Sequence, residues 1–121
     1  MKYAALTGFE KDFARLRKRF RTLDDDFARL KKFAIELYHA PVSVDNRGIV
    51  KVAGCCGDGY DTFKVRKFAC VSLKSRGAQS GLRVIYVFQP PDRVTFVEIY
   101  FKQDKENEDR ARIVSFTKTL A

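Results

Sequence analysis

Four basic residues lie in or directly after segments that otherwise have the composition of β-strands. They are Lys64, Arg66, Arg83 and Lys102. Charged side chains are costly inside a sheet unless they are paired or exposed on one face. Lys64 and Arg66 are two positions apart and therefore point to the same side of a strand. This pattern predicts a small sheet with a basic face that binds an anionic ligand.

Structural roles for the same residues are the alternative. Arg83 could pair with Glu98 across a hairpin, and Lys64 and Arg66 could form an ordinary solvated strand face. Tyr86 and Tyr100 fit either the core or the site. His39 lies near a predicted helix end before Pro41, where a cation is stabilised by the helix dipole, so we interpret it as structural.

Composition supports a folded, basic protein. The 121 residues are 45% hydrophobic and 13% aromatic, which excludes a disordered chain and predicts a single domain over residues 1–121. Lys and Arg number 24 against 15 Asp and Glu, a net charge of +9. Such a charge favours nucleic acid or an acidic protein as partner. An inert basic surface is the simpler alternative.

Several other classes of function are not expected. No apolar run approaches the roughly 18 residues of a membrane span, and charged residues follow the N-terminus too early for a signal peptide, so a cytoplasmic protein is expected. The three cysteines fit neither a zinc site nor a redox motif, so we expect reduced thiols, no metal and no cofactor. Residues 54–59 lack the ending of a phosphate-binding loop.

The first half of the chain predicts a short strand and two helices. Residues 1–6 read as a strand, and Thr7 with Glu10 forms a capping box that begins the first helix. Thr22 caps a second helix, with three aspartates in its first turn, and Pro41 ends it. Residues 41–61 are glycine-rich and predict a loop with at most one short strand at 49–53.

The second half predicts three antiparallel strands and a final helix. The first begins at Thr62, with a bulge near Lys67 where the apolar alternation slips and Cys70 inside the strand. Residues 82–88 and 94–101 are the clearest strands. A helix follows over residues 105–119, with the charged run 104–110 at its first turn, although the lysines of this run and Arg110 could also line the site. The result is an α+β fold: a helical hairpin and a C-terminal helix on a small antiparallel sheet, whose other face is free.

Four segments of this chain resemble one protein superfamily. They are Phe63-Lys-Val-Arg-Lys-Phe-Ala-Cys70, Leu73-Lys-Ser-Arg-Gly77, Ser80-Gly-Leu-Arg-Val-Ile-Tyr86 and Glu98-Ile-Tyr-Phe-Lys-Gln-Asp-Lys-Glu-Asn-Glu-Asp-Arg110. They look like the RelE/ParE superfamily of toxins from type II toxin–antitoxin systems, in a less characterised RelE-like subgroup. The resemblance covers most of the chain. It implies an antitoxin protein as partner and a basic sheet face that enters the ribosome and cleaves mRNA.

The resemblance also implies roles for individual residues. In the RelE branch no metal is needed: a 2′-hydroxyl attacks the adjacent phosphate while basic side chains activate it, stabilise the phosphorane and protonate the leaving oxygen. By motif position, the implied catalytic residues are Lys64, Arg66, Arg83 and Lys102. The expected RNA-binding residues are Lys67, Lys74, Arg76, Lys105, Tyr86 and Tyr100.

This chain departs from the family pattern after its last strand. Nuclease members commonly carry an arginine there and a tyrosine or histidine near the C-terminus, whereas this chain has Gln103 and Asp104 and no Tyr or His after Tyr100. Two other hypotheses therefore stay open. One is a non-enzymatic inhibitor of DNA gyrase, as in the ParE branch, and the other is a RelE-like fold that has lost catalysis and only binds. The sequence does not determine the oligomeric state.

Overall fold

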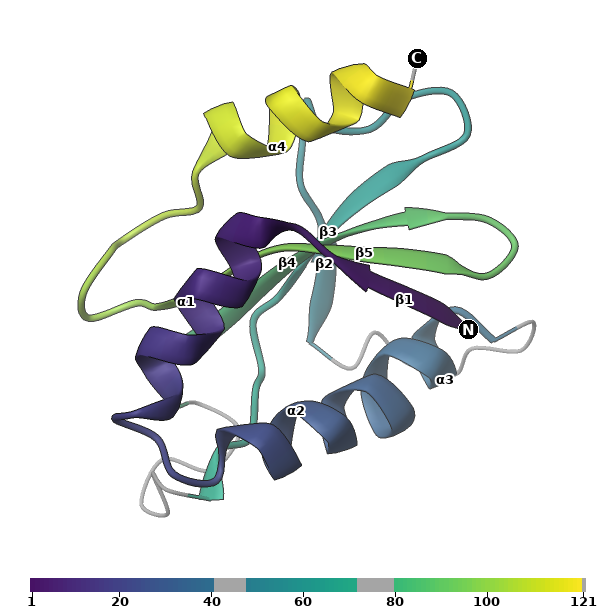
Figure 1. The fold of residues 1–121 in the computed structure, drawn as a ribbon. Helices are drawn as coiled ribbons and strands as arrows, with labels where there is room; N and C mark the ends of the chain where they lie inside the picture. Colours follow the sequence, from purple (N-terminus) through teal and green to yellow (C-terminus); the bar gives the residue numbers. More distant parts are fainter. Residues whose placement is uncertain (41–47, 72–79, 121) are drawn as a thin grey trace.

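A five-stranded mixed sheet forms the centre of the molecule (Figure 1). The computed structural model describes residues 1–40, 48–71 and 80–120. The strands, in the sheet order β1–β5–β4–β3–β2, are β1 (Lys2–Ala5), β5 (Arg93–Phe101), β4 (Leu82–Gln89), β3 (Asp61–Val65) and β2 (Ile49–Lys51). β1 runs parallel to β5, and the other neighbouring strands are antiparallel. The predicted α+β class is confirmed, with one parallel pair that the sequence did not indicate.

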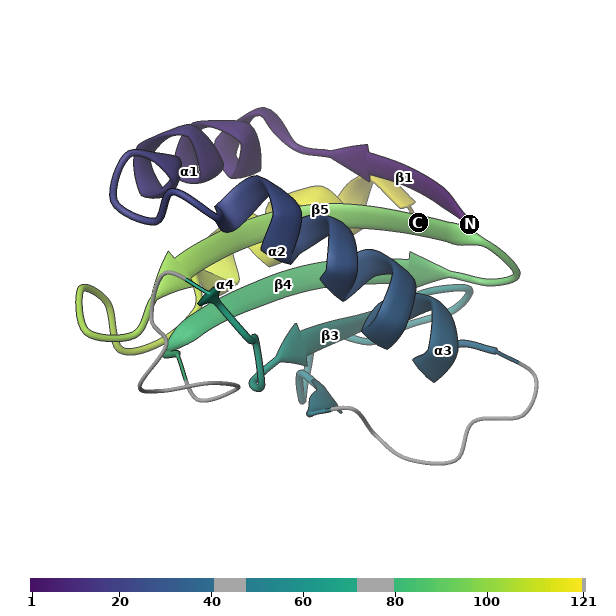
Figure 2. The same cartoon turned by 90° about the horizontal axis from the view of Figure 1, so that it is seen from below.

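Helices lie on both sides of this sheet. On one side are α1 (Thr7–Arg17) and a long second helix, in which α2 (Leu23–Leu30), a π-helical turn (Lys31–Ile35) and α3 (Glu36–Tyr38) are continuous (Figure 2). On the other side lies α4 (Arg110–Thr117), followed by a 3₁₀ turn (Lys118–Leu120) (Figure 1). The second face is therefore only partly free, because α4 covers one portion of it.

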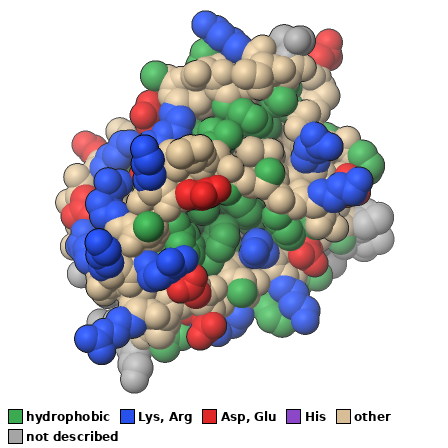
Figure 3. All heavy atoms as spheres, viewed as in Figure 1, with side chains coloured by type: hydrophobic (Ala, Val, Ile, Leu, Met, Phe, Trp, Pro, Cys, Tyr) green, Lys and Arg blue, Asp and Glu red, His purple; other side chains and the backbone are tan. Residues whose placement is uncertain are grey.

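The outward side of α1 is basic. Lys11, Arg15 and Lys18 are exposed there, and Lys and Arg side chains gather on the side of the molecule that carries this helix (Figure 3). Arg15 also pairs with Asp12, whose side chain is buried and accepts a second bond from Arg112 Nη1 at 2.6 Å. The ion pair between Asp12 and Arg112 joins α1 to α4 around the edge of β5.

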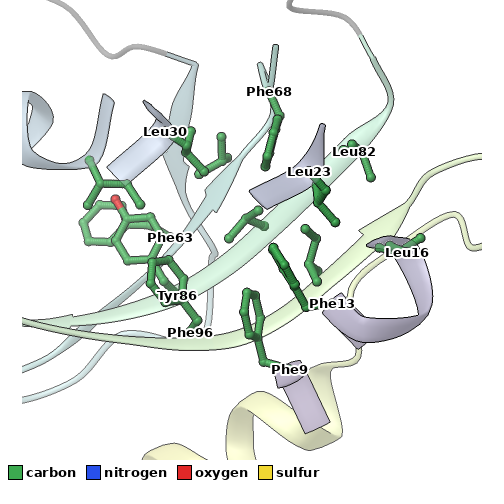
Figure 4. Packing of buried hydrophobic residues seen from close by; sticks show 14 of the residues in the cluster. Phe9, Phe13, Leu16, Leu23, Leu30, Phe63, Phe68, Leu82, Tyr86 and Phe96 are labelled. Carbon is green, nitrogen blue, oxygen red and sulfur yellow. The ribbon is translucent and has the colours of Figure 1, made fainter. Parts of the chain in front are cut away.

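The larger core lies between the sheet and the first two helices, and it is rich in phenylalanine (Figure 4). Phe9, Phe13 and Leu16 recur at helical spacing on α1 and are all buried. The sheet contributes alternate residues, among them Phe63, Tyr86 and Phe96 (Figure 4). A smaller core on the opposite face includes Ile85, Val87 and Ile113, which α4 buries. Strand alternation thus supplies both cores from the same strands.

A β-bulge in β5 sets which residues face the second side. Ile85 pairs with Glu98 while the next residue, Tyr86, pairs with Phe96, so Val97 is the extra residue. The bulge places Glu98 and Tyr100 on the same face as Arg83, which lies opposite Tyr100. The hairpin is symmetric about residue 91 between its turn and the pair of Tyr86 with Phe96, and beyond the bulge Glu98 lies opposite Ile85 instead of Val84.

Two predicted boundaries are corrected, and one is confirmed. Leu6 is the N-cap of α1, Thr7 is its first residue, and no side chain caps that end. β3 ends at Val65, so the change in apolar parity near Lys67 marks the end of a strand rather than a bulge, and Cys70 is buried outside any strand. Thr22 is the N-cap of α2 as expected, although its hydroxyl donates to Asp26 Oδ2 at 2.6 Å.

The start of α4 differs most from expectation. The helix begins at Arg110 instead of residue 105, because Asp109 is its N-cap and accepts a hydrogen bond from the backbone N–H of Arg112 at 3.1 Å. Residues 102–109 form turns and bends that cross the second face of the sheet. The charged run is therefore a connecting segment and not the first turn of a helix. Pro41 lies outside the described residues.

His39 is structural, as expected, but it is not a helix-end cation. It is the C-cap of α3, its ring stacks on Phe88 with 3.9 Å between centroids, and its Nε2 lies 2.8 Å from the Tyr86 hydroxyl. Burial lowers the pKa of His39 to about 4, and the negative charge of Asp61 opposes this only partly. The imidazole is therefore neutral at pH 7.

This burial predicts a loss of stability in mild acid. Because the unfolded histidine titrates near 6.5 and the folded one near 4, the unfolded state binds more protons between these values, and stability falls as the pH is lowered through them. Between pH 7.5 and 4.5 the wild-type protein should lose about 2 kcal/mol more than His39→Gln. Urea unfolding of both proteins across this range measures the difference, and equal pH dependence would contradict the assignment.

Candidate anion-binding site

A basic pocket lies on the part of the second sheet face that α4 leaves open. Its volume is about 350 Å³, within the range of small-molecule sites. Two acidic side chains, Glu106 and Glu108, line it. Six basic side chains also line it, an excess of four positive charges: Lys51, Lys64, Arg66, Arg83, Lys102 and Arg110. Anionic ligands are therefore favoured electrostatically.

All four residues predicted as catalytic line this one pocket. Lys64 projects from β3 beside Ile85 of β4, and Arg83 projects from β4 opposite Tyr100 of β5. Arg66 directly follows β3 and is two positions beyond Lys64. Lys102 follows β5, where its backbone N–H donates to the Gly81 carbonyl at 2.8 Å. Strand alternation and the pairing of β3 with β4 bring Lys64, Arg66 and Arg83 to one face, as the sequence predicted, and Lys102 joins them from the end of β5.

Arg83 retains most of its donors for a ligand. Its Nη1 donates to its own backbone neighbour, the Leu82 carbonyl, at 3.2 Å. The alternative pairing with Glu98 is not formed, because the Glu98 carboxylate is engaged by Lys105 and by the backbone N–H of Asp109. Within the described residues, neither Arg83 nor Arg66 forms an ion pair with a carboxylate. Unpaired guanidinium groups in a pocket suit a phosphate, which accepts two parallel hydrogen bonds.

Two cations of the pocket have an acidic partner in the described structure: Lys51 pairs with Asp61 at 3.5 Å, and Lys64 pairs with Glu108, which itself lines the pocket. The Lys64 Nζ lies 2.9 Å from Glu108 Oε1, with side-chain exposures of 20% and 14%. The Tyr100 hydroxyl donates to the same carboxylate oxygen at 3.5 Å, and Tyr100 is itself 4% exposed. Three titratable groups from β3, β5 and the connecting segment therefore meet at one point.

The pKa values at this point follow from burial and mutual attraction. Burial alone would lower the pKa of Lys64, but its hydrogen bonds to Glu108 and Tyr100 outweigh burial and raise it. Burial alone would raise the pKa of Glu108, but Lys64 and the charge of Arg110 lower it. Burial raises the pKa of Tyr100 despite the opposing effect of Lys64. At neutral pH the group is thus an ammonium, a carboxylate and a neutral phenol.

Glu98 fixes the segment that carries Glu108. This glutamate is 2% exposed at the centre of β5. One of its oxygens accepts from the Asp109 N–H at 2.8 Å, and the other binds Lys105 Nζ. The two bonds hold the residues on either side of Glu106, Asn107 and Glu108. A buried carboxylate with two donors is satisfied and can position a segment firmly.

The residues predicted to bind RNA are placed less uniformly. Tyr100 contacts Glu108 beside the pocket. Lys105 lies in a neighbouring depression with Asp12 and Arg112, and its Nζ is 5.8 Å from the centroid of the Tyr100 ring.

Tyr86 points to the opposite face and is fully buried, so it cannot contact a ligand in the pocket. Lys67 is exposed beyond the end of β3 and does not line the pocket. Lys74 and Arg76 lie outside the described residues.

Sequence reasoning missed two charged residues of the pocket, Lys51 from β2 and Glu108 from the segment after β5. Arg110, which the sequence left as a possible lining residue, does line it from the first turn of α4, where its Nη2 donates to the Ala53 carbonyl at 2.5 Å. A signal was available for Glu108, since a charged run that directly follows a basic strand can fold back over it.

No protein-family model, curated protein or solved structure matches this chain. The described residues contain no group of three or more His, Cys, Asp and Glu arranged to hold a metal ion. Cys55, Cys56 and Cys70 form no disulfide in the structure, and Cys55 and Cys70 are buried. No helix in the described part of the chain has both the length and the apolarity that a membrane crossing requires.

Proposed function

We propose that this protein is a toxin of a type II toxin–antitoxin system that cleaves mRNA on the ribosome without a metal. One observation carries the proposal: Lys64, Arg66, Arg83 and Lys102, which match the basic residues of RelE-like toxins by motif position, line one pocket with an excess of positive charge. The resemblance of the four sequence segments selects RNA among the anions that such a pocket would accept.

The chemistry of the pocket suits transfer at a phosphodiester. Arg83 and Arg66 are unpaired within the described residues and can bind the non-bridging oxygens of a phosphate, where negative charge increases in the phosphorane. Lys64 supplies a proton donor near them. In RNA the 2′-hydroxyl is the nucleophile and belongs to the substrate, so positioning, charge and proton transfer are the tasks left to the protein.

The same proposal includes the cellular setting. The toxin acts in the cytoplasm, where mRNA is translated, and a cognate antitoxin protein holds it inactive. An acidic antitoxin segment would complement the net charge of +9.

The proposal is tested by brief expression in bacteria without the antitoxin, followed by mapping of mRNA 5′ ends. We expect new ends inside coding regions with the wild-type protein. Arg66→Ala removes a pocket cation without breaking an ion pair in the described structure and should reduce these ends at least tenfold. Lys11→Ala removes the same charge from the exposed side of α1 and should leave them unchanged.

Two results would reject the nuclease. Growth arrest with intact messages would do so, and accumulation of cleaved DNA in the same cells would then favour a gyrase inhibitor. The absence of arrest, with the protein present and folded, would leave only a RelE-like fold that binds RNA or protein. Equal cleavage by Arg66→Ala and wild type would separate the activity from this pocket.

A further inference from the structure

Glu108 is a carboxylate within a pocket that is otherwise suited to anions. It lies 2.9 Å from Lys64 Nζ and is 14% exposed, so it neutralises one of the cations that would attract a phosphate. A carboxylate here weakens phosphate binding through repulsion between like charges. Its presence therefore needs a reason other than affinity for RNA.

A displaceable lid is not what the geometry indicates. The residues on both sides of the Glu106–Glu108 stretch are bound to Glu98, which is 2% exposed and lies inside the sheet. Asp109 also caps α4 through the Arg112 N–H at 3.1 Å. A segment bound at both ends to the sheet and to a helix presents the residues between those ends at fixed places. Glu108 is thus held as a functional group would be.

We propose that Glu108 is the proton acceptor of the RNA cleavage reaction, with Lys64 as its proton-donating partner. This inference rests on the proposed function. It supplies the proton-transfer group that the chain lacks at the C-terminal positions where related toxins carry Tyr or His. Glu108 faces Lys64 from β3, Tyr100 from β5 and Arg110 from the first turn of α4.

The proposed step balances within this pair. The 2′-hydroxyl proton passes to the Glu108 carboxylate as the 2′-oxygen bonds to phosphorus, and the bond from phosphorus to the 5′-oxygen of the next nucleotide breaks. That oxygen takes a proton from the Lys64 ammonium. The products are a 2′,3′-cyclic phosphate and a 5′-hydroxyl end. Protonated Glu108 then returns its proton to Lys64 across their 2.9 Å contact, and the site is restored.

The positions of the other cations fit this division of roles. Arg83 and Arg66 have no carboxylate partner in the described structure and are left to bind the phosphate oxygens. Lys64 is paired with the base, which orients its ammonium before substrate arrives. Tyr100 donates to Glu108 Oε1 at 3.5 Å and helps to fix the carboxylate without itself ionising, because burial raises its pKa.

The first experiment separates binding from cleavage with Glu108→Gln, which keeps the size and the acceptor for Lys64 but cannot take a proton. Purified protein is mixed with ribosomes that carry a synthetic mRNA, and single-turnover cleavage is measured. Binding is measured with the same mRNA carrying 2′-deoxy substitutions. We expect binding equal to or tighter than wild type and cleavage at least 100-fold slower. Glu10→Gln, the same change on exposed α1, should leave both unchanged.

A second experiment distinguishes the acceptor from the donor. In an mRNA whose scissile 5′-oxygen is replaced by sulfur, the leaving thiolate needs no proton. This substrate should restore cleavage by Lys64→Ala but not by Glu108→Gln. Glu108→Asp keeps a carboxylate on a shorter side chain and controls for any loss of stability caused by a change at this position. It should cleave faster than Glu108→Gln even where both variants are less stable than wild type.

The outcomes separate this inference from the function on which it rests. Wild-type cleavage together with equal or faster cleavage by Glu108→Gln would overturn the role of Glu108 and leave the nuclease standing. Rescue of Glu108→Gln by the sulfur substrate would also overturn the assignment as acceptor. Failure of the wild-type protein to cleave ribosome-bound mRNA would overturn both.

Discussion

Replacement of Arg83 by alanine should slow mRNA cleavage at least 100-fold and leave the fold intact. Arg83 is half-buried on β4, lines the basic pocket and has no carboxylate partner among the described residues. A donor aimed at the charge that develops in the transition state contributes about 3–4 kcal/mol in other enzymes. Its removal breaks no described ion pair, so the free energy of unfolding should change by about 0.5 kcal/mol or less. Single-turnover cleavage and urea unfolding measure the two effects.

The matched control for Arg83 is Arg93→Ala. Arg93 is an exposed arginine at the start of β5, outside the pocket, and its removal changes the net charge equally. We expect near wild-type cleavage from it. Arg83→Lys should recover part of the activity, since the ammonium keeps the charge and loses the two parallel hydrogen bonds. Wild-type cleavage by a folded Arg83→Ala protein would remove Arg83 from the site.

The elements that were predicted best are those with strong local signals. β4 and β5 lie within one residue of the predicted strands, because β-branched and aromatic residues fill them and two prolines mark the turn between them. The bulge at Val97 gave no such signal. β5 is apolar on both faces around this residue, so an extra residue does not disturb the pattern. The pairing of β1 with β5 likewise depends on contacts far apart in the sequence.

The residues of the candidate site likewise include some that local sequence patterns could place and one that they could not. Lys64, Arg66 and Arg83 could be placed on one face from period-two alternation alone. The same rule sets Tyr86 three positions from Arg83, on the opposite face, so its burial in the helical core could have been predicted. Glu108 could not, because its place depends on where the 102–109 segment crosses the sheet. The buried Glu98 binds this segment at Lys105 and Asp109, two contacts that no local pattern in the sequence indicates.

Loss of Glu98 is therefore expected to damage both the fold and the site. Glu98→Ala removes a buried carboxylate and leaves the Asp109 N–H without its acceptor. Each charge-assisted hydrogen bond contributes about 1.5–3 kcal/mol, so we expect a loss of about 3 kcal/mol in the free energy of unfolding. Glu98→Gln keeps an acceptor for Asp109 and should lose about 1 kcal/mol. Urea unfolding at pH 7 measures all variants.

The control for this prediction is the exposed partner. Lys105 is 43% exposed in its pair with Glu98, so Lys105→Ala should cost less than about 1 kcal/mol. If Glu98 acts on the site through the connecting segment, Glu98→Gln should also slow cleavage. The loss of cleavage should exceed what the small loss of stability explains, because Glu98→Gln releases Lys105 and with it one end of that segment. Stability of Glu98→Ala within about 0.5 kcal/mol of wild type would show that the segment is held by other contacts. In that case Glu108 would owe its position to Lys64 and Tyr100, and the pocket would be assembled from the strands without the buried glutamate.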